Sequence, residues 1–210
     1  MKAEDIINFA VHGELKQLSI SNISADNADR VENIAAIISY INLGIIELYK
    51  RFGLATQSRE LTDLTHGFSY TMEDDFLYIT NCTGNDEAET DIPLNDETAA
   101  LSVFQPTPYQ LYIAKTDEAD ERITSIFVTY IAVPALIKSS KDVIPLSYQY
   151  VEALLNYIAY RGHAAVSGNT NEENNAYYLR FEASCNNITN DGLITPDNQS
   201  NNKLDDRGFK

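Results

Sequence analysis

The clearest pattern of apolar positions along the chain spans residues 31–52 and has the period of an α-helix. Apolar side chains recur there at intervals of three and four residues, which places them on one helix face. They are Val31, Ile34, Ile38, Ile41, Ile45, Leu48 and Phe52. Polar residues within 24–27 suit an N-cap, and Gly53 suits the position after the helix. Ile37 and Ile46 are apolar on the other side, so the pattern predicts a helix that lies between two neighbours.

From residue 57 to about residue 133 the apolar period changes to two. The segments there are rich in β-branched and aromatic residues, and polar clusters with turn-forming residues separate them. This composition and period are typical of antiparallel strands. Residues 126–133 are apolar on both sides, so this strand is expected to be central in its sheet.

Residues 145–190 return to helical spacing in two segments. Pro145 suits a first helical turn and Gly168 a helix stop. Thr170 and Glu173 have the spacing of a capping box, which marks the start of the second segment. Because the link between the segments is short, they are expected to form an antiparallel helical hairpin.

Together these patterns predict an α+β fold: a helical bundle with an inserted antiparallel β lobe and a flexible C-terminal arm. The expected parts are the N-terminal helices of the bundle (1–56), the β lobe (57–144), the C-terminal helical hairpin (145–190) and the arm (191–210). A shorter and weaker helix is expected near residues 3–16. The composition of the arm favours disorder, and the alternative is an arm that becomes ordered on a partner.

The charge of the chain changes the range of possible partners. The net charge is −16, and residues 57–145 hold 16 acids and 5 bases, so the lobe carries most of the excess. Nothing resembles a basic stripe, which argues against tight nucleic-acid binding. An acidic surface facing DNA would instead repel it. From the sequence, no segment is expected to be long and apolar enough to cross a bilayer, so no membrane partner is expected.

The residues that could carry chemistry are few. The histidines are His12, His66 and His163, and none lies at metal-ligand spacing from another histidine or a cysteine. No motif for a nucleophile with its base, or for phosphate binding, is present. No catalytic, cofactor-binding or metal-binding residue is therefore assigned.

Two functions in other classes depend on the lobe. Its acidic run could bind a divalent cation, either calcium or the metal of a hydrolase, although solvated turns are the favoured interpretation. The run comprises Asp86, Glu87, Glu89 and Asp91. Alternatively, the chain could be a tail or baseplate protein whose lobe binds a glycan. That function would need one groove lined by Tyr70, Tyr78, Tyr109 and Tyr112.

Assembly is the function that the residues favour most. Tyrosine is common at interfaces because its ring buries a large area while its hydroxyl keeps a hydrogen-bond partner. The helix that begins near Pro145 is rich in tyrosine and also carries small residues that allow close approach. The residues expected at a subunit interface are Ile37, Ile46, Tyr148, Tyr157, Tyr160 and His163. The alternative is a monomer whose tyrosines complete its own core.

Four segments, in order, resemble the head-to-tail adaptor (connector) proteins of short-tailed, podovirus-type bacteriophages. They read "ENIAAIISYINLGIIELYKRF", "SIFVTYIAVP", "IPLSYQYVEALLNYIAYRGHA" and "AYYLRFEASCNNI". In that group a helix of the form "YINLGLIELYKRF" precedes a β insertion and a proline-led helix. The resemblance covers residues 27–190 and is most specific over residues 40–52 and 145–161. The acidic lobe and the asparagine-rich tail depart from the pattern.

The resemblance implies a structural virion protein, with no enzymatic activity and no cofactor. Such adaptors form a homo-oligomeric ring, typically of about twelve copies, at the head-tail junction below the portal protein. The ring extends the DNA channel, and DNA passes through it during packaging and ejection without specific binding. The β lobe would face tail or nozzle components, and the C-terminal arm would dock on the portal. The anchors of the arm would be Leu193, Ile194, Leu204 and Phe209.

Overall fold

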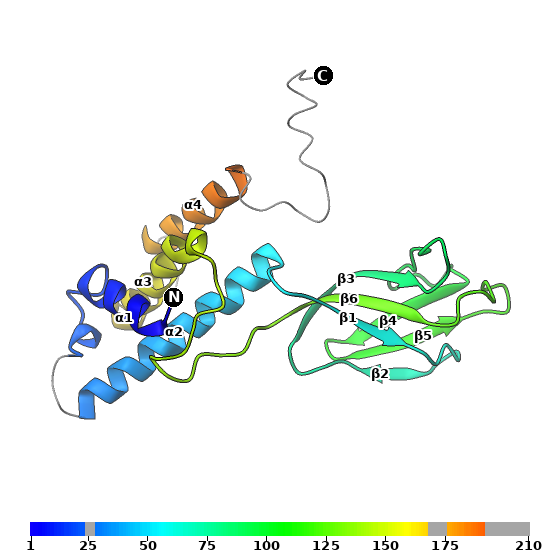
Figure 1. The fold of residues 1–210 in the computed structure, drawn as a ribbon, viewed down its shortest axis with the longest axis horizontal. Helices are drawn as coiled ribbons and strands as arrows, with labels where there is room; N and C mark the ends of the chain where they lie inside the picture. Colours follow the sequence, from blue (N-terminus) through cyan, green and yellow to red (C-terminus); the bar gives the residue numbers. More distant parts are fainter. Residues whose placement is uncertain (24–27, 168–175, 192–210) are drawn as a thin grey trace, which may run out of the picture. The chain divides into compact units, whose positions relative to one another are not determined.

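The structure is a computed structural model that describes residues 1–23, 28–167 and 176–191. The described residues form two compact units. We call residues 1–48 with 135–191 the helical unit and residues 49–134 the β unit. Figure 1 shows helices in the first and strands in the second, an α+β fold as predicted. The predicted N-cap residues of the long helix, the predicted capping box and the C-terminal arm lie outside the described residues.

The first helix, α1 (Ala3–His12), is shorter than predicted. Its N-terminal end is closed by the Lys2 backbone N–H, which donates to Asp5 Oδ2 at 2.9 Å. At the other end, the Gly13 N–H donates to the Phe9 carbonyl. One face of α1 is buried, and the residues on it are Ala3, Ile6, Ile7, Ala10 and Val11. The helix ends where this apolar period stops.

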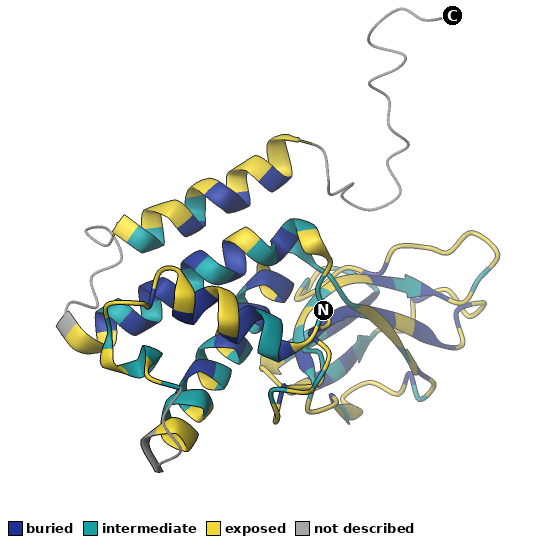
Figure 2. Ribbon diagram, turned by 60° about the vertical axis from the view of Figure 1, so that its left-hand side comes forward, coloured by how far each residue is buried: buried dark blue, intermediate teal, exposed yellow. Residues whose placement is uncertain are grey.

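The long helix, α2 (Ala28–Phe52), has the predicted extent but a different buried face. The side chains that point into the core are Ile37, Ile41, Ile45 and Leu48. Val31 is 69% exposed, and Ile34 and Ile38 are half-buried. The core face of α2 is therefore shifted from the predicted stripe toward Ile37, and Leu43 on the other side is 37% exposed. Figure 2 marks the buried and exposed positions along the helices.

By length and composition, α2 also meets the requirements for a membrane-crossing helix. The 23-residue helical segment Arg30–Phe52 contains an 18-residue stretch with a mean hydropathy of 1.4, and it is the one such segment among the described residues. This corrects the expectation that no segment is long and apolar enough. A core helix of a soluble protein passes the same test, and α2 contributes a fully buried row of side chains to its own chain.

The third helix, α3 (Val151–Ser167), follows a short 3-10 turn, Tyr148–Tyr150. Two glycines allow neighbouring elements to approach closely. A Cβ at Gly44 of α2 would lie 2.6 Å from Leu154 Cδ1, and a Cβ at Gly162 of α3 would lie 2.7 Å from Leu15 Cδ2. Since real Cβ atoms do not approach carbon atoms that closely, both contacts depend on the missing side chain.

The last helix, α4 (Ala176–Asn190), packs on α3 in the opposite direction. The ring of Tyr157 on α3 contacts Phe181 on α4, and the ring of Tyr160, later on α3, contacts Tyr178, earlier on α4. The two helices therefore run antiparallel. The structure therefore has the antiparallel helical hairpin that the sequence predicts.

The β unit contains two three-stranded antiparallel sheets. The first has the order β1-β6-β3, built from β1 (Thr56–Leu61), β6 (Ile126–Ala132) and β3 (Phe76–Gly84). The second has the order β2-β5-β4, built from β2 (Ser69–Thr71), β5 (Gln110–Lys115) and β4 (Leu101–Thr107). The central position of β6 agrees with its two apolar faces. Buried side chains from both sheets form one core, among them Leu61, Val103, Ile113, Val128 and Tyr130.

Candidate interaction surfaces

The two buried residues of the predicted interface set belong to the core of the helical unit. Ile37 is fully buried on the core face of α2. Tyr160 is also buried, and its ring meets Tyr157 at 5.8 Å and Tyr178 at 5.2 Å. Their side chains are occupied by contacts within the chain. The sequence placed Ile37 on the far side of the helix because a helix with apolar residues on two sides does not reveal which side faces inward.

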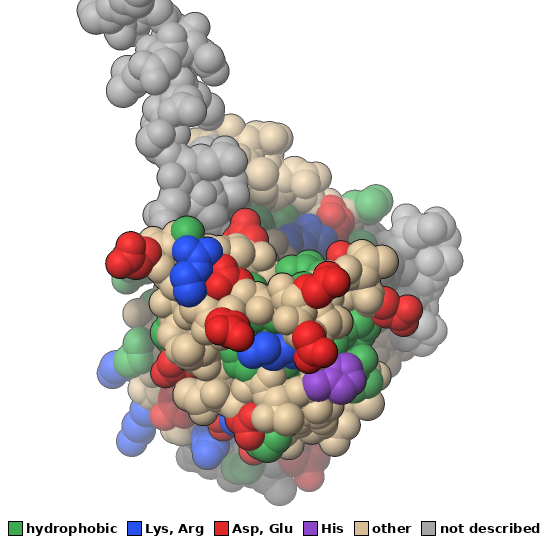
Figure 3. Space-filling view, turned by 90° about the vertical axis from the view of Figure 1, so that its right-hand side faces the viewer, with side chains coloured by type: hydrophobic (Ala, Val, Ile, Leu, Met, Phe, Trp, Pro, Cys, Tyr) green, Lys and Arg blue, Asp and Glu red, His purple; other side chains and the backbone are tan. Residues whose placement is uncertain are grey.

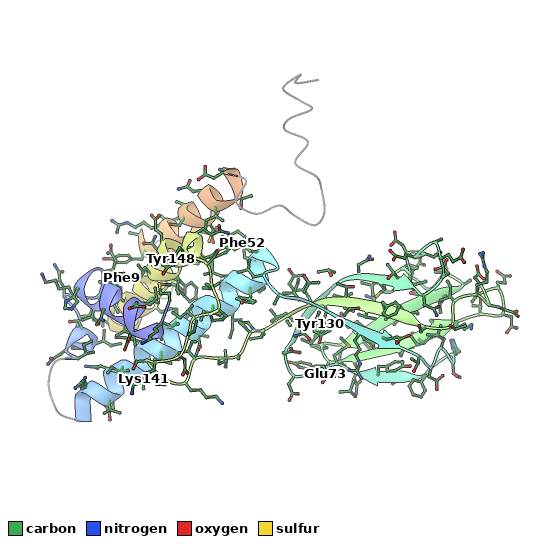
Figure 4. All side chains as sticks on the ribbon, in the orientation of Figure 1. Phe9, Phe52, Glu73, Tyr130, Lys141 and Tyr148 are labelled. Carbon is green, nitrogen blue, oxygen red and sulfur yellow. The ribbon has the colours of Figure 1, made fainter. Side chains whose placement is uncertain are left out.

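The other residues of that set retain exposed surface. Tyr148 is 79% exposed at the start of the 3-10 turn (Figure 4), and Ile46, Tyr157 and His163 are half-buried. These residues lie on different elements, α2 for Ile46 and the α3 region for the tyrosines and the histidine. The assignment of these residues to a subunit interface stays a prediction.

His163 is part of a cluster that ties α4 to the end of α1. Its imidazole stacks on the Tyr177 ring at 4.4 Å between centroids, and its Nε2 lies 2.9 Å from the Glu14 carbonyl, to which an Nε2–H donates. The Arg180 guanidinium lies over the Tyr177 ring and 3.6 Å from the Glu14 carboxylate. Burial, with the nearby Glu14 carboxylate, raises the pKa of Tyr177. The cluster positions α4, and its side chains satisfy one another.

Next to this cluster, α1, α3 and α4 border a surface groove of about 550 Å³. Its deepest polar groups are Asn156 and Ser184, both buried, and the Asn156 amide donates to Ser184 Oγ at 3.0 Å. Leu155 and Phe9 give it apolar walls, and Phe9 is 56% exposed. Glu152 is exposed at the rim. We call this feature the α1/α3/α4 groove.

Sequence reasoning missed this groove and several exposed apolar residues of the helical unit. The exposed residues are Phe9, Val31, Leu43, Leu136, Val143, Val166 and Leu179. Phe9 is one of several apolar residues in the first helix, so the sequence pattern does not indicate that its side chain faces outward. Leu136 and Val143 occur in a segment between strand and helix, where apolar periodicity says nothing about burial.

In the β unit, the four tyrosines proposed for a glycan groove do not face one surface. Tyr78 belongs to the first sheet, whereas Tyr70 and Tyr112 belong to the second. Tyr70 pairs with the buried Leu111, and cross-strand partners share a face. Tyr112 is the next residue along β5 and points to the opposite face, where it stacks on Phe104 at 5.0 Å. The predicted groove is therefore wrong for these residues.

The acidic loops of the β unit are organised as turns. Asp86 accepts hydrogen bonds from the Thr90 N–H at 2.9 Å and the Thr90 hydroxyl at 2.7 Å. These hydrogen bonds lower the pKa of Asp86. Figure 3 shows acidic side chains spread over the face of the β unit that is turned toward the viewer. Within the described ranges, no three His, Cys, Asp or Glu side chains are grouped so that they could hold a metal ion.

The helical unit keeps exposed apolar surface, and the β unit is built around its own core. These features are more typical of a protein that assembles with other subunits than of one that binds a small molecule. The comparisons agree with that class. The model of the SU10 adaptor protein family matches residues 2–200, and the chain belongs to this family. The head-to-tail adaptor resemblance is thus confirmed at the level of the family, which is one of structural phage adaptors.

No curated protein matches the chain. Among solved structures, the chain is similar to a chain of the "Neck of empty GTA particle computed with C6 symmetry". The two share 14% sequence identity with a TM-score of 0.29, over 80% of this chain and 89% of that chain.

Proposed function

We propose that this protein is the head-to-tail adaptor subunit of a phage or phage-like particle. In this proposal it forms a ring of about twelve copies at the head-tail junction of the virion. The ring lies below the portal protein, extends the DNA channel and joins the head to tail or nozzle components. Membership of the SU10 adaptor protein family supports the adaptor role.

The observation that carries the proposal is the apolar outer face of α2. Its inner face fills the core of the helical unit, while on the side away from that core Leu43, 37% exposed, and the half-buried Ile46 keep apolar surface in contact with water. A surface helix with only one apolar face would need no partner, but a second apolar face gains free energy when a neighbouring subunit covers it. A ring subunit has such a neighbour on each side.

The same face argues less well for a membrane. A helix surrounded by lipid exposes apolar side chains all round, whereas α2 turns Ile41, Ile45 and Leu48 inward. Polar groups on α2 also enter the fold: the Asn42 amide donates to the Ile137 carbonyl at 2.8 Å and accepts from its N–H at the same distance. A protein neighbour is therefore the better occupant.

The charge of the chain supports a channel wall that does not retain DNA. A net charge of −16 repels phosphate groups, so DNA would slide past without being held. For the contact with the portal, we propose the C-terminal arm, with the sequence anchors Leu193, Ile194, Leu204 and Phe209. Tyr148 and Ile46, which retain exposed surface, are the members of the predicted interface set best suited to subunit contacts.

The native mass of the full chain, alone and mixed with the portal protein from the same genome, tests the proposal. We expect a defined complex with several copies of this chain on one portal ring. A matched chain that ends at Asp191 keeps α4 whole and removes the arm. We expect this shorter chain to load at least tenfold less on the portal. A full chain that stays monomeric and ignores the portal would contradict the adaptor role.

A further inference from the structure

A segment of the helical unit exposes two apolar and two basic side chains. Residues 136–143 connect the β unit to the 3-10 turn before α3. Leu136 and Val143 are 48% and 67% exposed, and Lys138 and Lys141 are exposed as well. We call residues 136–143 the basic segment. Exposed apolar and basic side chains therefore lie along the same short segment, whose Ile137 is buried.

The basic segment is held in one conformation, although it is not a helix or a strand. Asp142 Oδ2 accepts the backbone N–H groups of Lys138 and Ser139 at 2.8 and 2.9 Å, and these bonds lower the pKa of Asp142. The Asp142 and Ser140 carbonyls accept the N–H groups that begin α1, from Ala3 and Glu4. A segment fixed in this way loses little conformational entropy when it binds a partner.

The α1/α3/α4 groove has the complementary character. The exposed ring of Phe9 and the half-buried Leu155 offer apolar surface to a visiting side chain. Of the acids on the rim, Glu14 is paired with Arg180, while the exposed Glu152 is near no basic group in any contact of the described residues. The groove thus presents apolar walls beside a carboxylate, and the basic segment presents apolar side chains beside two ammonium groups.

The two surfaces lie at different places on the same helix. The basic segment closes the N-terminal end of α1, whereas the groove borders the C-terminal half of α1 and the two residues after it, from Phe9 to Glu14. Two different and complementary surfaces on one subunit give a head-to-tail contact, which repeats around a closed ring. A single self-complementary patch would instead give an isolated pair.

From this we infer that the α1/α3/α4 groove of one copy receives the basic segment of the next copy, with Lys141 facing Glu152 and Val143 packing beside Phe9. The inference rests on the proposed ring and identifies the surfaces that join its subunits. Electrostatic attraction orients the two copies, and the apolar side chains lose their exposed area on contact.

Charge reversal tests the contact in the full-length chain bound to the portal. Lys141→Glu and Glu152→Lys each place like charges together, so each is expected to weaken association about tenfold at every subunit contact. The double variant restores opposite charges and is expected to recover assembly. Lys115→Glu, a reversal on β5 of the β unit and outside both surfaces, is the matched control. Native mass measurement reports the number of copies bound.

Cross-linking gives a second readout that does not depend on charge. A Val143→Cys chain mixed with a Phe9→Cys chain is expected to give covalent pairs with a short bis-maleimide in the assembled complex. A Leu179→Cys chain replaces Phe9→Cys as the control, because Leu179 is 55% exposed but lies outside the groove. The native cysteines Cys82 and Cys185 are both buried.

The outcomes separate the inference from the proposed function. If the wild-type chain forms no multi-copy complex with the portal, the proposed function fails and the inference fails with it. If the wild-type complex forms, but the reversals leave it unchanged or the control pair cross-links as well as the test pair, only the groove contact is overturned. Rescue by the double reversal together with selective cross-linking supports the inference.

Discussion

Truncating Phe181 is the sharpest test of how α4 is held in the helical unit. Phe181 is fully buried, and its ring packs 5.2 Å from Tyr157 and 5.9 Å from Tyr178 between centroids. Removing a buried phenylalanine side chain costs about 3–5 kcal/mol, because both the transfer free energy and the packing around the cavity are lost. Phe181→Ala should therefore remove most of the free energy that fixes α4.

The loss is expected to be local. α4 contributes few side chains to the core, and those that are buried are Phe181, Ser184, Cys185 and Ile188. The remaining helices keep their own buried contacts, such as those of Ile41 and Leu154. A local opening of α4 then becomes easier while the free energy of unfolding of the rest changes little.

Hydrogen exchange measured by mass spectrometry distinguishes a local opening of α4 from a destabilisation of the whole helical unit. A destabilisation of about 3–4 kcal/mol should speed exchange of the α4 amides by about two to three orders of magnitude. Leu179→Ala is the control on the same helix, because Leu179 is more than half exposed and should change exchange less than about threefold. Equal acceleration in α1, α2 and α3, or none in α4, would refute the reasoning.

Two further predictions concern single buried sites. Gly44→Ala should lower the melting temperature, because the new Cβ would lie 2.6 Å from Leu154 Cδ1. Overpacking of this kind costs about 1–3 kcal/mol, which exceeds the roughly 1 kcal/mol that alanine adds in helix propensity. A melting temperature at or above that of the wild type would be contrary evidence, and Ser39→Ala at an exposed position of α2 is the control. Burial raises the pKa of the Cys82 thiol to about 12, so only about 10⁻⁴ of it is thiolate at pH 8. Disulfide exchange reagents should leave Cys82 unmodified until denaturant is added, and rapid labelling of the folded chain would disprove its burial.

The fold followed from the sequence where one periodicity dominated. The two apolar faces of residues 126–133 correctly placed β6 at the centre of its sheet. The change of period at the β unit and the return to helical spacing near Pro145 correctly gave an α+β fold with a helical hairpin. These features depend on local patterning, which a single sequence carries in full.

The site depended on information that local patterning does not contain. On α2 both sides are apolar, so the pattern does not show which side faces the core. Ile37 is buried rather than Ile38 because Gly44, which has no side chain, lets α3 approach on that side. On β5, Tyr112 faces away from Tyr70 because strand register decides the face. The α1/α3/α4 groove brings together residues more than 170 positions apart, and no spacing within one element indicates it.

The acidity of the chain has a structural cause in addition to any effect on DNA. Several aspartates accept a backbone N–H within four residues and thereby close a turn, and hydrogen bonding lowers the pKa of each. They are Asp63, Asp86, Asp96, Asp120 and Asp142. A short carboxylate that bonds to its own backbone is the usual way to fix such loops. In the proposed adaptor, the charge that would repel DNA is thus partly the charge that fixes the loops. Replacing these aspartates with neutral residues to weaken the field would therefore also loosen the loops. A test of the electrostatic role should instead reverse acids that form no hydrogen bond or ion pair within the described part of the chain, such as Glu118, which lies exposed between β5 and β6.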